Sequence, residues 1–179
     1  MKEHKILFTG TMGAGKTTAI AAISDIAPVS TDVQNNDPEL DKARTTVGLD
    51  YGELRLGDDE RLRLYGTPGQ ERFAFMWKIL AKGALGLVIL IDNTRPAPLA
   101  DLSTYLENFA ELIAASACVI GVGRLDSCPQ PALDDYAGFL EQRALRCPVV
   151  AVDVREAEQV RMLLDLLLLQ LECREYLGE

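Results

Sequence analysis

Apolar residues along this chain form two kinds of pattern, short continuous runs and longer stretches with helical spacing. Four continuous runs have the length of a strand: residues 5–9, 85–91, 118–122 and 148–152. Continuous apolar runs of this length are typical of strands buried on both faces. Residues 49–56 and 61–65 instead alternate on either side of a polar turn, which predicts a β-hairpin.

Helical spacing separates these strands. The predicted helices are residues 18–23, 74–82, 99–115, 133–146 and 156–176. Alternating buried strands and helices predict an α/β fold, a mixed and mostly parallel six-stranded sheet with helices on both faces, to which the hairpin adds an antiparallel edge strand. Residues 28–46 are polar and are predicted to form a long loop. The length of 179 residues fits a single domain, 1–179.

A glycine-rich motif joins the first strand to the first helix. It reads Gly10-Thr11-Met12-Gly13-Ala14-Gly15-Lys16-Thr17, the G-x-x-x-x-G-K-[ST] pattern of a phosphate-binding loop, and Thr18 continues into the helix. Glycine lets the backbone bend closely around a phosphate, and the helix N-terminus presents N–H groups to the same anion. Lys16 can bridge the β- and γ-phosphates, and the Thr17 hydroxyl can ligate Mg²⁺. An accidental glycine-rich turn is the alternative, and the flanking strand and helix argue against it.

Charge and cysteine spacing restrict the classes of partner. The net charge of -9 disfavours nucleic acid and anionic lipid, so no nucleic-acid partner is expected. The four cysteines show no C-x-x-C spacing, which argues against a metal site built from them. No signal peptide, membrane-spanning run or lipidation motif is evident, so we expect a cytoplasmic protein without a direct membrane anchor.

Three further loops follow strands of the predicted sheet. Gly66-Thr67-Pro68-Gly69-Gln70 follows the hairpin, Gly123-Arg124-Leu125-Asp126 follows a buried strand, and Asp153-Val154-Arg155 follows the last strand. With these loops the chain resembles Ras-like small GTPases over nearly all its length. The T-P-G-Q segment is similar to that of the bacterial and archaeal branch related to the gliding-motility GTPase. The resemblance implies a P-loop NTPase fold, a Ras-like G domain, with GTP or GDP and Mg²⁺ as ligands.

The resemblance also implies roles for single residues. Thr46, or its neighbour Thr45, would ligate Mg²⁺ together with Thr17, and the N–H of Gly69 would bond the γ-phosphate. Gln70 would orient the attacking water beside Lys16. Arg44 could act as an arginine finger, although a solvated loop charge is the alternative.

Three departures from the family pattern concern the metal and the base, and the third of them is Asp153-Val154-Arg155 in place of the family's S-A-K. Gly66 stands where the family has aspartate, and Asp92 is a candidate substitute. Gly123 stands where the family has asparagine and so loses the amide that braces the phosphate loop. Arg124 can still cover the purine, and Asp126 can accept hydrogen bonds from the guanine N1–H and amine. The segment Val154–Arg155 would complete the base site, with the Val154 N–H donating to guanine O6.

These observations predict a small GTP-binding switch that hydrolyses GTP slowly. The resemblance implies a roadblock-type regulatory protein as partner and a role in polarity or motility. A nucleotide-binding module without hydrolysis is one alternative, which Gly66 favours. A P-loop small-molecule kinase or ATPase is another, but no arginine-rich lid is evident in the sequence.

Overall fold

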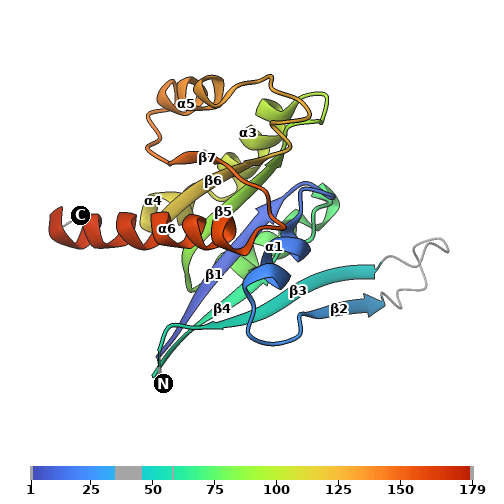
Figure 1. Cartoon of the computed structure of the whole chain (residues 1–179), viewed down its shortest axis with the longest axis vertical. Coiled ribbons are helices and arrows are strands. Elements are labelled where there is room, and N and C mark those ends of the chain that lie inside the picture. The colour runs from blue at the N-terminus through green and yellow to red at the C-terminus, as the bar shows by residue number, and fades with distance from the viewer. Residues whose placement is uncertain (1, 35–45, 58, 178–179) are drawn as a thin grey trace.

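The computed structural model describes residues 2–34, 46–57 and 59–177, and this part of the chain forms one sheet with helices on both faces (Figure 1). The strands are β1 (Lys2–Gly10), β2 (Val29–Gln34), β3 (Thr46–Arg55), β4 (Glu60–Gly66), β5 (Ala84–Asp92), β6 (Ala117–Gly123) and β7 (Val149–Ala151). Their order across the sheet is β2-β3-β4-β1-β5-β6-β7. Strands β4, β1, β5, β6 and β7 run parallel, whereas β3 is antiparallel to β4.

The predicted fold class is confirmed, and all six predicted strands are present. The prediction of a loop throughout residues 28–46 was wrong for β2, which adds a seventh strand to the described sheet. β2 pairs antiparallel with β3, from Val29 opposite Tyr51 to Gln34 opposite Thr46. As a result β3 is not the edge strand that the sequence predicted. The sequence of β2, Val-Ser-Thr-Asp-Val-Gln, carries no continuous apolar run, so its pairing partner rather than its own pattern makes it a strand.

Six helices cover the two faces of the described sheet. They are α1 (Lys16–Ile23), α2 (Ala74–Ala81), α3 (Pro98–Asn108), α4 (Ala110–Ala115), α5 (Leu133–Glu141) and α6 (Ala157–Leu177), and a short 3₁₀ turn (Glu71–Phe73) precedes α2. Helices α1 and α6 pack on one face, and α2 to α5 pack on the other (Figure 1). The predicted single helix over 99–115 is divided at Phe109, which is buried and stacks on Trp77 at 5.9 Å between ring centroids.

The core lies in two layers because neighbouring residues of a strand point to opposite faces. In β1, Ile6 and Phe8 belong to the layer under α1 and α6, while Leu7 belongs to the layer under α2 to α5. All three side chains are almost completely buried. This arrangement explains the continuous apolar runs, since a strand covered on both faces needs no polar positions.

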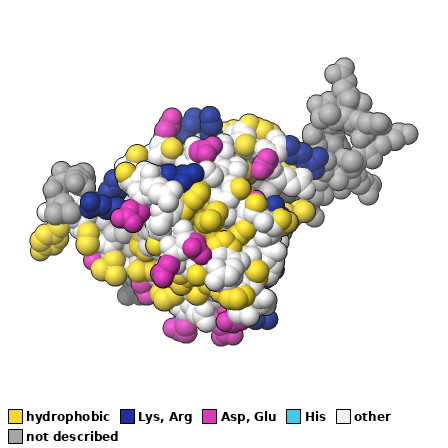
Figure 2. All heavy atoms as spheres, turned by 90° about the horizontal axis from the view of Figure 1, so that it is seen from above, with side chains coloured by type: hydrophobic (Ala, Val, Ile, Leu, Met, Phe, Trp, Pro, Cys, Tyr) yellow, Lys and Arg dark blue, Asp and Glu magenta, His cyan; other side chains and the backbone are white. Residues whose placement is uncertain are grey.

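The sheet brings the carboxyl ends of its parallel strands, and the loops that follow them, to one edge. On the face shown in Figure 2, lysine and arginine side chains are scattered among acidic ones and do not merge into a continuous basic band. Among the described residues, no helix is long and apolar enough to cross a membrane.

Candidate functional site

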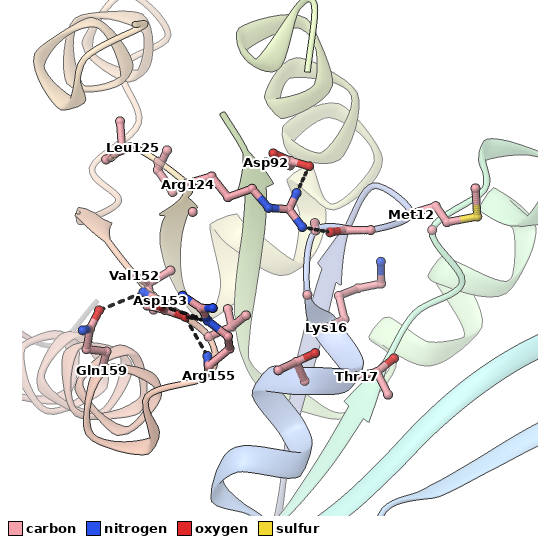
Figure 3. Close-up of a pocket in the computed structure, with 18 of the residues that line it drawn as sticks. Met12, Lys16, Thr17, Asp92, Arg124, Leu125, Val152, Asp153, Arg155 and Gln159 are labelled. Atoms are coloured by element: carbon pink, nitrogen blue, oxygen red, sulfur yellow. Dashed lines mark hydrogen bonds and ion pairs between the residues drawn. The ribbon is translucent and has the colours of Figure 1, made fainter. Parts of the chain in front are cut away.

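A cleft of about 970 Å³ lies at the carboxyl ends of the parallel strands. Four segments far apart in the sequence line it: residues 12–18, 67–69, 122–127 and 151–155. A crevice at this edge is the usual place for a ligand in an α/β sheet, and its volume is at the upper end for a small-molecule site. Figure 3 labels side chains from the first, third and fourth of these segments around the cleft.

The loop between β1 and α1 requires glycine at two positions. Gly10 has φ +145° and Gly15 has φ +97°, a region that other residues rarely adopt. A Cβ on Gly10 would collide with the carbonyl oxygen of Leu90, and one on Gly15 would lie 2.6 Å from a methyl of Val154. Gly15 is also the residue before α1, so the free N–H groups of the first helical turn face the cleft.

Lys16 is buried at the floor of this loop. Its Nζ donates hydrogen bonds to the carbonyl oxygens of Gly10 at 2.7 Å and Thr11 at 2.8 Å. Burial lowers the pKa of Lys16 to about 8, and the Asp50 carboxylate opposes this decrease. A phosphate in the cleft would be a stronger acceptor for this ammonium than either carbonyl, because it is charged.

An acidic residue that the sequence analysis missed lies beside the phosphate loop. Asp50 is buried in β3 directly opposite Gly66, and its Oδ2 accepts a 2.6 Å hydrogen bond from the Thr17 hydroxyl. A Cβ built on Gly66 would lie 3.0 Å from Oδ2 of Asp50. The carboxylate of Asp50 therefore fills the space next to Thr17 that a side chain at position 66 would otherwise enter.

Asp92, the substitute considered from the sequence, does not have this role. Its carboxylate bonds Thr94 and Arg124, not Thr17. The pattern of β3 held a signal for Asp50, because Gly52 and Leu54 face α1 and the core, and Asp50 is an acid in phase with them. An acid on the buried face of a strand indicates a charged partner or a metal.

The Thr67–Gly69 segment packs directly against the phosphate loop. A Cβ on Gly69 would lie 2.5 Å from the backbone nitrogen of Met12 and 2.9 Å from Nζ of Lys16. Within the described residues, the N–H of Gly69 makes no hydrogen bond. Gln70 lies outside the cleft lining, and its Nε2 is 3.8 Å from the sulfur of Met12. Only Gly69 of this pair is therefore placed to meet a ligand in the cleft.

Two contacts fix the start of this segment. The N–H of Thr67 donates to the carbonyl oxygen of Phe8 at 2.9 Å, and the hydroxyls of Thr67 and Thr9 are 2.8 Å apart. The indole N–H of Trp77, which is fully buried, donates to the carbonyl oxygen of Pro68 at 2.8 Å. The backbone from Thr67 to Pro68 is thus held by contacts with the core.

The loops after β6 and β7 form the other end of the cleft. The carboxylate of Asp126 is exposed and makes no hydrogen bond or ion pair within the part of the chain that is described. The backbone N–H of Val154 is likewise without a bond there. Arg155 instead folds onto Asp153, with NH2 2.5 Å from Oδ2, and this lowers the pKa of Asp153 to about 2. One free acceptor and one free donor therefore face the cleft.

Arg124 spans the cleft between its two ends. Its guanidinium donates to the carbonyl oxygen of Gly13 at 3.1 Å and pairs with the carboxylate of Asp92 (Figure 3). Its predicted role of covering a purine stays a prediction, whereas its contact with the phosphate loop is seen in the structure.

Not every predicted site residue is placed at the cleft. Thr46 begins β3, four residues before Asp50, and its predicted role as a metal ligand stays a prediction. Its pairing with Gln34 holds its backbone in the sheet. Arg44 and Thr45 lie outside the described residues. Gly10 and Thr11 shape the phosphate loop without lining the cleft, whereas Thr18 lines it.

The oxygen donors beside the phosphate loop fit Mg²⁺. Thr17 offers a hydroxyl and Asp50 a carboxylate, and Mg²⁺ in phosphate-binding sites usually takes one or two protein oxygens together with phosphate oxygens and water. Within the described residues, no group of three or more His, Cys, Asp or Glu side chains could hold a metal by itself. A magnesium ion here would accordingly depend on a bound phosphate.

Comparison with known proteins supports a nucleotide-binding P-loop domain. RabC of Dictyostelium discoideum, a Ras-related protein, is 24% identical over 175 residues, covering 94% of this chain and 84% of RabC. Human Rab-12, also Ras-related, is 26% identical over 128 residues, which cover 69% of this chain and 48% of Rab-12. An uncharacterized protein of Methanocaldococcus jannaschii is 28% identical over 93 residues, 52% of this chain and 53% of that protein. The chain thus spans about half the length of the last two relatives.

A family model also matches most of the chain. It covers residues 32–167 and carries the description "Conserved hypothetical ATP binding protein". The matched region begins after the phosphate loop and contains Asp50, the Gly66–Gln70 segment and both loops at the far end of the cleft. The sheet order, the cleft and the Ras-related similarity agree on a Ras-like α/β fold. Since this match spans well over half of the sequence, the chain belongs to this family of conserved hypothetical ATP-binding proteins.

Proposed function

We propose that this protein is a guanine-nucleotide switch that binds GTP or GDP with Mg²⁺ and hydrolyses GTP slowly. The observation that carries the proposal is the contact of Gly69 with Met12 and Lys16. A terminal phosphate bound to Lys16 would meet the free N–H of Gly69, and loss of that phosphate would remove the bond. A loop that responds to one phosphate in this way is the basis of a nucleotide switch.

The preference for guanine rests on the far end of the cleft. The free Asp126 carboxylate can accept from the guanine N1–H and exocyclic amine, and the free Val154 N–H can donate to O6. Adenine presents an acceptor at N1 and a donor at the exocyclic amine, so both contacts would be mismatched. The Ras-related similarity favours the same base, whereas the family description names ATP.

For hydrolysis, water would attack the γ-phosphorus as the bond to the bridging oxygen breaks, giving GDP and phosphate. Lys16 would stabilise the charge on the phosphates, and Thr17 with Asp50 would hold Mg²⁺, which neutralises that charge when bound. Gln70 must leave Met12 to orient the water. Thr46 would be a further metal ligand. Arg44 as an arginine finger belongs to the same proposed rearrangement.

A nucleotide-binding module without hydrolysis is the second candidate. Two observations favour it: Gly66 lacks a carboxylate, and the side chain of Gln70 is directed to the Met12 sulfur rather than into the cleft. In a GTPase, Gln70 can enter the cleft and a partner protein could promote that movement. In a module without hydrolysis, Gln70 does not enter the cleft even when a partner is bound.

For a partner, we extend the resemblance to the gliding-motility branch and propose a roadblock-type regulatory protein, with a role in polarity or motility. The surface that follows Gly69 supports a protein contact. Phe75 and Ile79 lie one turn apart on α2, and 64% and 63% of their surfaces are exposed. Exposed apolar pairs next to a segment that responds to nucleotide are suited to a regulated interface.

The proposal is tested first by the nucleotide that the protein carries. Purified protein is denatured, the released nucleotide is identified by chromatography, and the nucleotide-free form is titrated with GDP and ADP. We expect GDP to bind at least tenfold more tightly than ADP, and Asp126→Ala to remove that difference. Equal or tighter binding of ADP would refute the guanine assignment. Single-turnover hydrolysis of GTP, with and without a roadblock-type protein, then separates a GTPase from a module without hydrolysis.

A further inference from the structure

The loop after β6 lacks the side chain that would brace the phosphate loop in the family pattern. Gly123 stands at the asparagine position and has no side chain to donate a hydrogen bond. A phosphate loop without a brace would hold a nucleotide less firmly, because its backbone N–H groups must keep fixed directions. The contacts of the next residue show how this chain compensates.

Arg124 connects three segments that meet at the cleft. It follows the end of β6, its guanidinium donates to the Gly13 carbonyl oxygen in the phosphate loop, and it pairs with Asp92 at the end of β5. Arg124 also has φ +63°, in the left-handed region that residues other than glycine rarely adopt. Such a conformation persists where the surrounding contacts impose it, and these sites are often functional.

Asp92 is itself fixed for this purpose. Its Oδ1 accepts hydrogen bonds from the Thr94 backbone N–H at 3.0 Å and from the Thr94 hydroxyl at 2.6 Å, while Oδ2 accepts from Arg124. The Asp92 side chain is 10% exposed and that of Arg124 is 50% exposed. The carboxylate is therefore a rigid, buried anchor, and the arginine reaches from it across the surface of the cleft.

The bond to Gly13 fixes the orientation of one peptide group. Because the peptide unit is planar, holding the Gly13 carbonyl also sets the direction of the Ala14 N–H. Gly13 has φ +84° and would have no side-chain contacts within 4 Å if it carried a Cβ, so packing does not hold it. The Ala14 N–H also donates to the Thr11 carbonyl oxygen at 3.1 Å within the loop. Arg124 adds the contact that ties this peptide group to the end of the sheet.

We propose that Asp92 and Arg124 act together as positioning residues that brace the phosphate loop in place of the missing amide at position 123, and so slow the release of bound nucleotide. This inference rests on the proposed nucleotide-binding function and adds two residues to it. If the pair braces the loop in this way, its removal should change nucleotide release more than the stability of the fold.

The guanidinium is necessary for this arrangement. Its planar fork donates to two acceptors in different segments at once, whereas a lysine ammonium is a compact point charge. Replacing Arg124 by lysine would restore the residue of the usual motif and yet should weaken the brace. If Arg124 only covered the purine, the lysine of the usual motif would serve equally well and nucleotide release would not change.

The test is the release rate of a fluorescent GDP analogue from the full chain, with the ADP analogue in parallel. Asp92→Asn and Arg124→Lys should each raise the release rate by about 10- to 100-fold, as expected for loss of a hydrogen bond to a charged group. Asp101→Asn is the matched control, because Asp101 also pairs with an arginine, Arg95, and lies outside the cleft lining. It should leave the rate unchanged.

A rescue variant separates bracing from damage to the fold. A Cβ on Gly123 would come no closer than 3.6 Å to its neighbours, so the backbone there has room for the Cβ of an asparagine. Gly123→Asn combined with Arg124→Lys should return release to the wild-type rate, and Asp92→Asn added to that pair should have no further effect.

The outcomes are distinct. Release rates of Asp92→Asn and Arg124→Lys within twofold of wild type would overturn the brace while leaving nucleotide binding intact. A wild-type protein that binds neither analogue would overturn the proposed function itself. Thermal melting of each variant without nucleotide shows whether it is folded. If Asp92→Asn does not fold, Arg124→Lys and its combination with Gly123→Asn still test the brace.

Discussion

Replacing Asp50 by asparagine should weaken the coupling between Mg²⁺ and nucleotide. The substitution keeps the shape of the side chain and the acceptor for the Thr17 hydroxyl, now 2.6 Å from Oδ2, and removes only the negative charge. A nucleotide site that takes its metal-neutralising carboxylate from Asp50 should lose magnesium affinity. If the site does not need the Asp50 carboxylate, its magnesium affinity should stay unchanged.

The geometry sets the size of the effect. A magnesium ion about 2.1 Å from the Thr17 hydroxyl would lie within roughly 5 Å of the Asp50 carboxylate. At an effective dielectric constant near 20, a divalent cation and a unit charge at that separation attract by about 7 kcal/mol. Desolvation of both ions cancels most of this attraction. The loss seen for residues that support a metal ligand is about 10- to 100-fold in affinity, which is about 1.4 to 2.7 kcal/mol.

The assay is release of a fluorescent GDP analogue as a function of free Mg²⁺. At pH 6.5 Lys16 is protonated, since its pKa is about 8, so a change in lysine charge does not contribute. We expect Asp50→Asn to raise the midpoint of the magnesium dependence by about 10- to 100-fold. Glu53→Gln is the control, because Glu53 lies on the same strand but pairs with Tyr51 and Arg61. Its midpoint should equal that of the wild type.

A strand-to-strand exchange of the acid makes the reasoning refutable. Asp50→Gly combined with Gly66→Asp moves the carboxylate to the position that the family pattern uses, and should restore most of the lost magnesium affinity. A midpoint for Asp50→Asn within twofold of wild type would refute the role of Asp50. In that case, magnesium binding by the exchange variant would not show that the carboxylate at position 66 replaces Asp50.

Three other predictions concern the same cleft. Trp77→Phe removes the donor to the Pro68 carbonyl oxygen and should lower the unfolding free energy by about 1 to 2 kcal/mol in urea, followed by circular dichroism. The pKa of Lys16 is about 8 in the folded protein, against an ordinary value of 10.5 for a lysine in the unfolded chain, so between these values the unfolded chain binds more protons and stability increases with pH. The unfolding free energy of nucleotide-free protein should therefore rise by roughly 1 kcal/mol from pH 8 to pH 9, and Lys16→Met should abolish this rise. Gln70→Leu should slow single-turnover GTP hydrolysis by about tenfold or more while leaving GDP affinity unchanged, and equal rates would assign water orientation to another residue.

The sequence predicted those features whose residues lie close together along the chain. The phosphate loop could be predicted because Gly10 and Gly15 are needed for backbone geometry within a few residues of Lys16 and Thr17. The buried strands could be predicted because burial on both faces leaves a continuous apolar run in the sequence.

Features that depend on distant pairing could not be predicted. β2 is a strand only because β3 pairs with it, and the structural role of Asp50 depends on its register opposite Gly66. Asp92 was the candidate substitute from the sequence, but in the fold its carboxylate bonds Thr94 and Arg124 and not Thr17. The division of the predicted helix at Phe109 likewise reflects contact with Trp77, which lies 32 positions earlier in the sequence.

The close approach of Gly69 to Met12 and Lys16 has a consequence for ligand selectivity. A diphosphate leaves this approach as it is, whereas a terminal phosphate between Lys16 and Gly69 requires the segment to move back just far enough for the Gly69 N–H to donate to it. If the closed arrangement outnumbers the open one tenfold, the apparent affinity for triphosphate falls about tenfold, or about 1.4 kcal/mol, and that for diphosphate does not change. The fold by itself would then favour the diphosphate, and a protein that binds and stabilises the withdrawn segment would raise triphosphate affinity without contacting the nucleotide.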